Sequence, residues 1–193
     1  MVSIYFVRHA QPDFSWNDTS TRPLTAEGLE DSKRVTEMLA DKNIMAVYSS
    51  PFKRTMQTVS GLADKLGLGI ITDERLRERI IGKRIESDFL DYARHQWQDF
   101  GYKAIGGESL AEVQERNITA LSPVISRHEN ESIAVATHGT SLSAIINYYD
   151  SRFGFDDFLG IINTMPYILK VIFENGRLTS MQDILRIEKV YNG

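Results

Sequence analysis

The chain contains no cysteine among its 193 residues, which excludes disulfides, thiolate nucleophiles and zinc–thiolate sites. It also lacks an apolar run near the roughly 18–20 residues needed to span a bilayer, so we expect no membrane association. The N-terminal stretch MVSIYFVRHA has no basic segment ahead of its apolar residues, unlike a signal peptide, and a cytoplasmic location is the resulting expectation. The net charge of −4 argues against a nucleic-acid partner, which favours a basic surface.

Strand-like and helix-like segments alternate along most of the chain, and its length suits a single domain over residues 1–193. Asn-Gly between two apolar segments near the end predicts a hairpin. This alternation predicts an α/β sandwich with a mostly parallel central sheet and an antiparallel strand near the C-terminus. The predicted strands are 2–7, 44–50, 68–72, 132–137, 167–173 and 178–185, and the predicted helices are about 26–41, 51–66, 110–127 and 139–149.

One segment interrupts this regular alternation. Aromatic and charged residues mix in the stretch before Ser109, which predicts a helical, lid-like insertion at about 80–108. Ser109 and Glu112 have the spacing of a capping box at the start of the next helix. Pro123 lies inside that helix and is expected to kink or shorten it.

Two of the predicted strands end in a histidine followed by a small residue, in IYFVRHAQ and IAVATHGT. Because ligands of open α/β sheets bind outside the carboxyl ends of the strands, we expect His9 and His138 to share one crevice. The alternative is that each histidine only ends its strand. The other histidines, His95 and His128, lie in polar helical contexts and are expected to be solvated.

Cationic side chains accompany the two histidines. Arg8 precedes His9, and Arg54 lies in the first turn of the helix that follows the second strand. A helix N-terminus favours anions, so an arginine there indicates that an anion binds nearby. Glu78 lies in the basic stretch ERLRERIIGKR, where it is either part of a surface ion-pair network or a general acid beside a cationic pocket. These five residues together suggest phosphoryl transfer, with a neutral imidazole as nucleophile and arginines to balance phosphate charge.

The segments VRHA, PLTAEG, SSPFKRTMQT, LRE, GGES and THG follow one another in this order along the chain. In that order they resemble the motifs of the histidine phosphatase family, which is phosphoglycerate-mutase-like. The resemblance implies a three-layer α/β/α sandwich, no metal and no cofactor. It implies that His9 is phosphorylated in turnover and that Glu78 is the proton donor. The residues implied to contact the substrate are Arg8, Gln11, Arg54, His138 and Gly139.

The chain departs from the family pattern directly after the nucleophile, where Ala10 replaces the usual glycine. Alanine fits there if its backbone avoids positive φ. The chain is short for a glycolytic mutase and its insertion is modest, so we expect a metal-independent phosphatase that acts on a small phosphorylated metabolite or a phosphoprotein. The alternatives are a phosphoglycerate-mutase-type phosphotransferase and a non-catalytic phosphate-binding module on the same fold.

Overall fold

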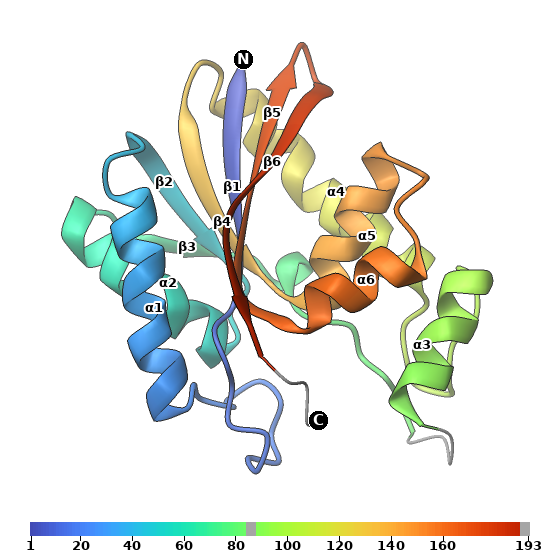
Figure 1. Cartoon of the computed structure of the whole chain (residues 1–193). Helices are drawn as coiled ribbons and strands as arrows, with labels where there is room; N and C mark the ends of the chain where they lie inside the picture. The colour runs from blue at the N-terminus through green and yellow to red at the C-terminus, as the bar shows by residue number, and fades with distance from the viewer. Residues whose placement is uncertain (84–87, 190–193) are drawn as a thin grey trace.

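The alternating strands and helices of the chain are described for residues 1–83 and 88–189 in a computed structural model (Figure 1). The predicted insertion at about 80–108 includes residues 84–87, which lie outside the described residues. The elements in chain order are β1 (Val2–Arg8), α1 (Ala26–Leu39), β2 (Ile44–Ser49), α2 (Lys53–Leu66), β3 (Ile70–Thr72), the 3-10 turn η1 (Glu74–Leu76), α3 (Phe89–Gln98), α4 (Leu110–Arg127), β4 (Ser132–Thr137), α5 (Gly139–Tyr149), α6 (Phe155–Ile162), β5 (Thr164–Glu174) and β6 (Arg177–Glu188).

The strands form one six-stranded sheet in the order β3-β2-β4-β1-β5-β6. The first four strands in this order are parallel to one another, whereas β5 and β6 are antiparallel additions at one edge. The turn between β5 and β6 contains Asn175 and Gly176 with φ of 51° and 74°, as the Asn-Gly signal predicts. Helices α1 and α2 cover one face of the sheet and α4 and α5 the other (Figure 1), which confirms the predicted three-layer α/β fold.

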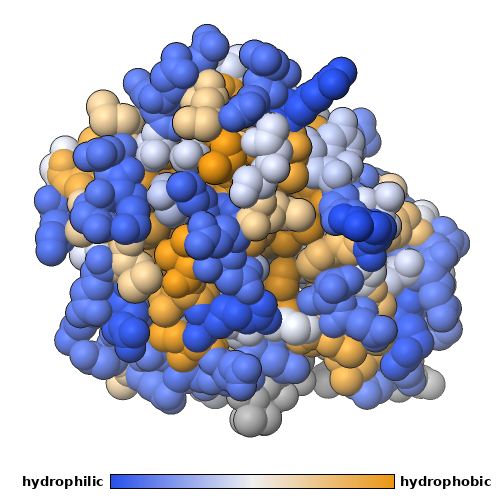
Figure 2. Space-filling model, turned by 45° about the horizontal axis from the view of Figure 1, so that its top comes forward, coloured by the Kyte–Doolittle hydropathy of each residue, from blue (hydrophilic) through white to orange (hydrophobic). Residues whose placement is uncertain are grey.

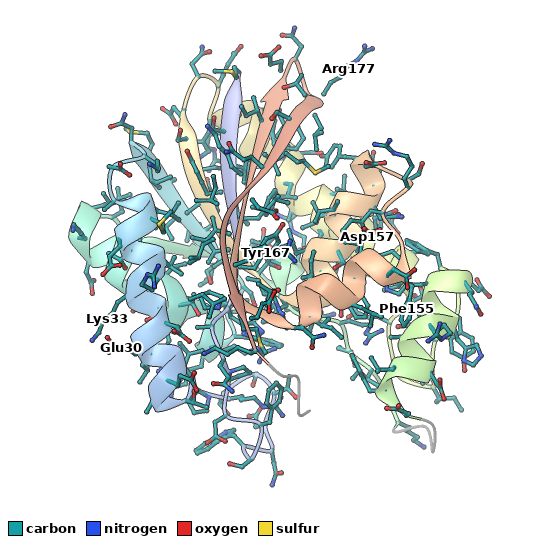
Figure 3. The ribbon with its side chains drawn as sticks, viewed as in Figure 1. Glu30, Lys33, Phe155, Asp157, Tyr167 and Arg177 are labelled. Atoms are coloured by element: carbon teal, nitrogen blue, oxygen red, sulfur yellow. The ribbon has the colours of Figure 1, made fainter. Side chains whose placement is uncertain are left out.

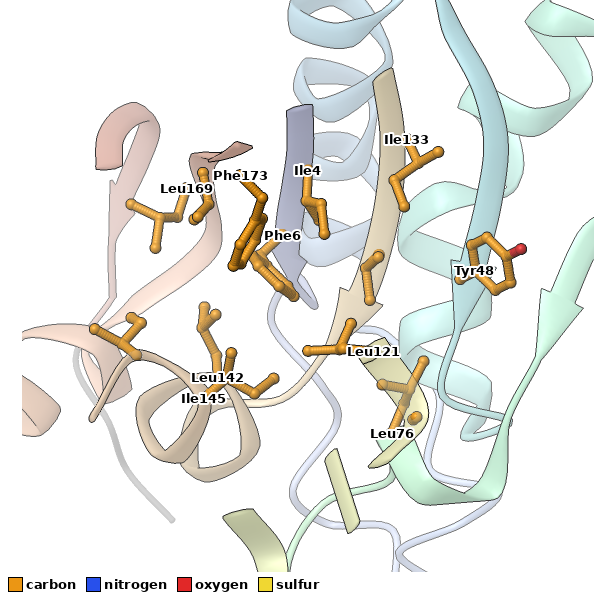
Figure 4. Packing of buried hydrophobic residues seen from close by; sticks show 14 of the residues in the cluster. Ile4, Phe6, Tyr48, Leu76, Leu121, Ile133, Leu142, Ile145, Leu169 and Phe173 are labelled. Atoms are coloured by element: carbon orange, nitrogen blue, oxygen red, sulfur yellow. The ribbon is translucent and has the colours of Figure 1, made fainter. Parts of the chain in front are cut away.

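Strand β1 is buried on both faces, which explains its continuous apolar sequence. Ile4 and Phe6 pack into a core with residues of α4 and α5 such as Leu121 and Leu142 (Figure 4). The alternate residues of the strand, including Tyr5, belong to a second core under α1 and α2. Two-sided packing fixes the strand, and with it the position of the residues at its carboxyl end.

One helix contains the proline that was expected to kink or shorten it, and another was not predicted. Helix α4 continues through Pro123 to Arg127, the end of its predicted range, so the proline does not shorten it. The proline leaves the carbonyl of Thr119 without its intrahelical donor, and Arg75 Nη1 donates to that oxygen at 3.3 Å instead. Helix α6 was not predicted from the sequence; it packs with Phe158 and Ile162 against Ala93 of α3.

His128 is buried, so the prediction that it is solvated is wrong. It follows the last turn of α4, which lies against the sheet, and its ring turns toward β2. Its Nε2 lies 2.9 Å from the hydroxyl of Tyr48, and its Nδ1 lies 2.6 Å from a carboxylate oxygen of Glu131. This residue therefore ties the end of α4 to the sheet.

The outer surface carries mainly polar side chains. Glu30 and Lys33 form an exposed ion pair at 2.5 Å on α1 (Figure 3). The face drawn in Figure 2 is largely hydrophilic, with hydrophobic groups visible between the polar ones. Among the described residues, no helix combines the length and the apolar character required to cross a membrane.

Candidate active site

His9 directly follows β1, and its backbone N–H donates to the carbonyl of Thr137 on β4 at 3.2 Å. Its ring Nδ1 lies 2.7 Å from the carbonyl oxygen of Ala10. Because a carbonyl oxygen can only accept, Nδ1 carries the proton and the lone pair remains on Nε2. Burial, followed by the charges of Arg54 and Arg8, holds the pKa of His9 well below 6.5. His9 is therefore neutral at pH 7, which is the form required of a nucleophile.

Arg8 lies beside His9 and is almost completely buried. Its Nη1 donates to the carbonyl oxygens of Ile161 and Thr164, the latter at 2.8 Å, so the guanidinium is anchored at the carboxyl end of α6. Gly139 begins α5 next to this guanidinium. A Cβ at that position would lie only 3.2 Å from Arg8 Nε, so a glycine permits the close approach of α5 to the arginine.

Arg54 and His138 form a hydrogen-bonded pair opposite His9. Arg54 Nη2 lies 3.1 Å from His138 Nδ1, and His138 Nε2 lies 2.8 Å from Ser50 Oγ. Since arginine can only donate, His138 Nδ1 accepts and the ring proton resides on Nε2. Burial, with the charge of Arg54, lowers the pKa of His138 well below 6.5. Burial also lowers the pKa of Arg54 to about 10, so its charge persists at pH 7.

The rings of His9 and His138 have centroids 5.2 Å apart at an angle of 66°. The residues come from the carboxyl ends of β1 and β4, which pair in parallel along their whole length. The two histidines therefore lie side by side as expected, but His138 is fully buried and only His9 is among the residues that line the cavity described below. Phe52 packs edge-on against the other side of His138, also at 5.2 Å, which fixes the ring.

Glu78 reaches the same region from the segment that follows η1. One of its carboxylate oxygens accepts from the backbone N–H of Arg79 at 2.8 Å, and the other accepts from the N–H of Thr140 at 3.2 Å. Thr140 lies in the first turn of α5, where the partial positive charge of a helix N-terminus attracts a carboxylate. This carboxylate is thus an acid–base group held at the end of a helix.

Arg8, His9, Arg54 and Glu78 line one cavity of about 630 Å³, a size typical of small-molecule sites. Arginines outnumber carboxylates on its wall, which suits a dianion such as a phosphate monoester. The further charged lining residues are Arg22, Arg79 and Asp18, and the apolar ones include Phe14, Phe52, Phe89, Ile80, Ile81 and Ile162. Within residues 1–83 and 88–189, no group of three or more His, Asp or Glu side chains is arranged to hold a metal ion.

Gln11 lies beside this cavity but turns toward helix α1. Its carbonyl accepts from the N–H of Thr25 at 3.0 Å, and its side-chain oxygen lies 3.4 Å from the Thr25 hydroxyl. Gly28 packs on the same backbone, where a Cβ would lie 2.3 Å from the Gln11 carbonyl oxygen. The glycine of PLTAEG therefore seats α1 against the chain that leaves the nucleophile.

Ala10 is not among the residues with positive φ, so alanine fits this position without strain. Its N–H donates to Thr58 Oγ1 at 3.0 Å, and the same hydroxyl donates to the carbonyl of Arg54 at 2.7 Å. Sequence reasoning did not identify Thr58, although its spacing of four from Arg54 places both residues on one face of α2. It also did not identify Ser50, which receives the hydrogen bond from His138.

Comparison with known proteins identifies the family and the fold. The model of the histidine phosphatase superfamily (branch 1) matches residues 4–182. A probable phosphoglycerate mutase GpmB of Serratia proteamaculans is 30% identical over 161 residues, which cover 76% of this chain and 74% of that protein. The corresponding protein of Yersinia pestis is 29% identical over the same share.

Solved structures show the same fold. Bacillus stearothermophilus YhfR has a TM-score of 0.78 at 23% identity and covers 93% of this chain and 95% of its own. A phosphoserine phosphatase mutant of Entamoeba histolytica in complex with phosphoserine has a TM-score of 0.76 at 19% identity. The match covers 94% of this chain and 96% of that chain. A mycobacterial glucosyl-3-phosphoglycerate phosphatase in complex with VO3 has a TM-score of 0.77 at 16% identity. The match covers 95% of this chain and 97% of that chain.

Proposed function

The chain belongs to the histidine phosphatase superfamily, and we propose that it is a metal-independent phosphatase that hydrolyses phosphate monoesters through a phosphohistidine on His9. The observation that carries this proposal is the neutral His9, whose Nε2 lone pair is free while Nδ1 is bonded to the Ala10 carbonyl. It lies between two buried arginines in one cavity.

In the first step, His9 Nε2 attacks the phosphorus atom. The new N–P bond forms as the ester P–O bond breaks, and the electron pair of that bond goes to the leaving oxygen. Glu78 gives this oxygen a proton, so the product leaves as an alcohol. Arg8 and Arg54 balance the charge on the phosphoryl oxygens. His138 supports this arrangement from behind, since its Nδ1 accepts from Arg54 and its Nε2–H donates to Ser50.

In the second step, water attacks the phosphohistidine. The ionised Glu78 takes the proton of the water, the N–P bond breaks with its electron pair returning to His9, and inorganic phosphate leaves. The substrate is a small phosphorylated metabolite or a phosphoprotein side chain. The cavity volume of about 630 Å³ favours the small metabolite.

A phosphoglycerate-mutase-type phosphotransferase is the second candidate. The names of the curated relatives favour it, since those at 29–30% identity are called probable phosphoglycerate mutases. The names of the solved phosphoserine and glucosyl-3-phosphoglycerate phosphatases favour hydrolysis. Incubation with 3-phosphoglycerate separates the two activities, because a phosphatase releases inorganic phosphate and a mutase forms 2-phosphoglycerate.

The proposal is tested by the hydrolysis of p-nitrophenyl phosphate in EDTA. We expect turnover by the wild type, an acid-labile phosphoprotein after brief mixing with substrate, and loss of both in His9→Ala. His95→Ala is the matched control, because His95 is an exposed histidine on α3. Full activity in His9→Ala would overturn the mechanism, and substrate binding without any turnover in the wild type would indicate the non-catalytic binding module.

A further inference from the structure

Glu108 has an unusually complete set of hydrogen-bond donors for a carboxylate outside the cavity wall. Arg77 donates to it through both terminal nitrogens, at 2.5 and 2.8 Å. Arg116 donates through Nε and Nη2, at 2.9 and 3.2 Å. The backbone N–H of Ile80 adds a fifth bond at 2.9 Å. The side chain is only 15% exposed, so this is a half-buried, fully hydrogen-bonded cluster and not a solvated ion pair.

Two of these three donor residues lie on either side of Glu78 in the sequence. Arg77 precedes it, and Ile80 follows two residues later. Arg116 reinforces the first side, because its Nη1 also donates to the carbonyl of Arg77 at 2.8 Å. The backbone of Glu108 reinforces the second side, because its N–H donates to the carbonyl of Ile80 at 2.8 Å. The main chain on both sides of Glu78 is therefore bonded to one carboxylate and its arginine partner.

Glu108 stays charged throughout the physiological range. Burial raises its pKa, but the hydrogen bonds from Arg77, Arg116 and Ile80 outweigh this effect and hold the pKa at about 2. A group with this pKa neither gives nor takes a proton at neutral pH. It is a fixed anion, and its contribution lies in where it holds its neighbours.

We propose that Glu108 is a positioning residue that holds the segment 77–80 so that the Glu78 carboxyl faces the leaving oxygen in the cavity. The proposal rests on the proposed function, in which Glu78 is the proton donor. Glu108 touches neither the cavity nor the reacting atoms. Its effect passes through the backbone that carries Glu78 and through the N–H of Arg79, which donates to Glu78 at 2.8 Å.

A displaced proton donor produces a characteristic kinetic defect. When the leaving group is a comparatively acidic phenol such as p-nitrophenol, the leaving oxygen needs little protonation as the P–O bond breaks. When it is phenol, a much weaker acid of similar shape, protonation by Glu78 accelerates the step. Misplacement of Glu78 therefore slows phosphohistidine formation from phenyl phosphate and leaves its formation from p-nitrophenyl phosphate nearly unaffected. General loss of structure slows both substrates alike.

The experiment measures the single-turnover rate constant of phosphohistidine formation in Glu108→Gln, and its half-saturating substrate concentration, for these two substrates. We expect the rate constant for phenyl phosphate to fall by about 10–100-fold, the range that a misplaced catalytic group produces. For p-nitrophenyl phosphate we expect the rate constant to fall by less than about threefold, and the half-saturating concentration should change little for either substrate. Glu112→Gln is the matched control, because Glu112 lies on α4 with an exposed Lys103 partner. It should match the wild type.

Three further variants make the result decisive. Glu78→Gln should show the same selectivity for leaving group, and Glu78→Gln combined with Glu108→Gln should lose no more than Glu78→Gln alone. Glu108→Asp keeps the charge and should recover part of the phenyl phosphate rate. If Glu108→Gln fails to fold, Arg116→Gln removes the second arginine of the cluster and is expected to show the same selectivity.

The outcomes distinguish this proposal from the proposed function. Equal losses for both substrates in Glu108→Gln, or no loss in a folded protein, would overturn the positioning role even if His9→Ala is inactive. If Glu78→Gln shows no dependence on the leaving group, the positioning role fails with it. Activity that survives in His9→Ala overturns the proposed function itself.

Discussion

Gly139→Ala should reduce activity without destabilising the protein. The added Cβ would lie 3.2 Å from Arg8 Nε and 3.4 Å from its Cζ and Nη2. These contacts are tighter than the optimum of about 3.5–4 Å for non-bonded atoms, so the guanidinium must shift. Arg8 cannot shift freely, because the carbonyls of Ile161 and Thr164 accept from its Nη1. The shift therefore displaces the charge that faces the phosphoryl group.

The size of the effect follows from the hydrogen bonds at stake. A hydrogen bond to a charged group contributes about 1.5–3 kcal/mol, so weakening one between Arg8 and the phosphoryl group predicts a loss of roughly 10–100-fold in kcat/KM. Stability should change by less than about 1 kcal/mol, because alanine is the better helix former and offsets part of the strain. The change in kcat/KM is measured with p-nitrophenyl phosphate, and stability by thermal unfolding.

Gly160→Ala is the matched control for this substitution. Gly160 lies within α6, where a Cβ would meet Arg186 Nη2 at an ordinary 3.6 Å. We expect full activity and a slightly raised Tm. The reasoning is refuted if Gly139→Ala keeps wild-type activity, or if the two variants lose activity to the same extent.

Two other predictions concern titration and stability. Since the pKa of His9 is held well below 6.5, the nucleophile stays neutral as the pH falls through that value. The rate of phosphohistidine formation from p-nitrophenyl phosphate, whose leaving group needs little protonation by Glu78, should therefore be constant from about pH 8 to about pH 6 after correction for substrate ionisation; halving of the rate at pH 6.5 would contradict this. Tyr48→Phe removes the hydroxyl that lies 2.9 Å from His128 Nε2, leaving a buried nitrogen without that partner. Unfolding in urea should show a loss of about 1–3 kcal/mol with unchanged kinetics, and an unchanged midpoint would show that the bond contributes nothing.

The position of the two histidines could be predicted from the sequence because it depends on topology alone. Strands with continuous apolar sequence must lie inside a sheet covered on both faces, and their carboxyl ends then share one edge. His9 and His138 follow two such strands, so their meeting needs no knowledge of side-chain contacts. Arg54 was predictable for a similar reason, since it opens the helix that follows a neighbouring strand.

Contacts between side chains distant in sequence could not be predicted in this way. Glu108 and Arg77 are 31 positions apart, and neither periodicity nor strand order indicates that they meet. The burial of His128 depends on a hydrogen bond across 80 positions to Tyr48. Gln11 was assigned to the substrate on its place in a motif, yet its side chain lies near Thr25. In each case the local sequence is polar and compatible with solvent, and only the packing of separate elements decides the outcome.

The ends of two helices hold Arg8 and Glu78 in the site, and one of these helices was not predicted. Arg8 is anchored by carbonyls at the carboxyl end of α6, where a helix carries partial negative charge. Glu78 accepts from an N–H in the first turn of α5, where the partial charge is positive. Both side chains line the cavity together with His9. The strands therefore determine where the chemistry lies, and the ends of α5 and α6 hold two of the charged side chains that surround it.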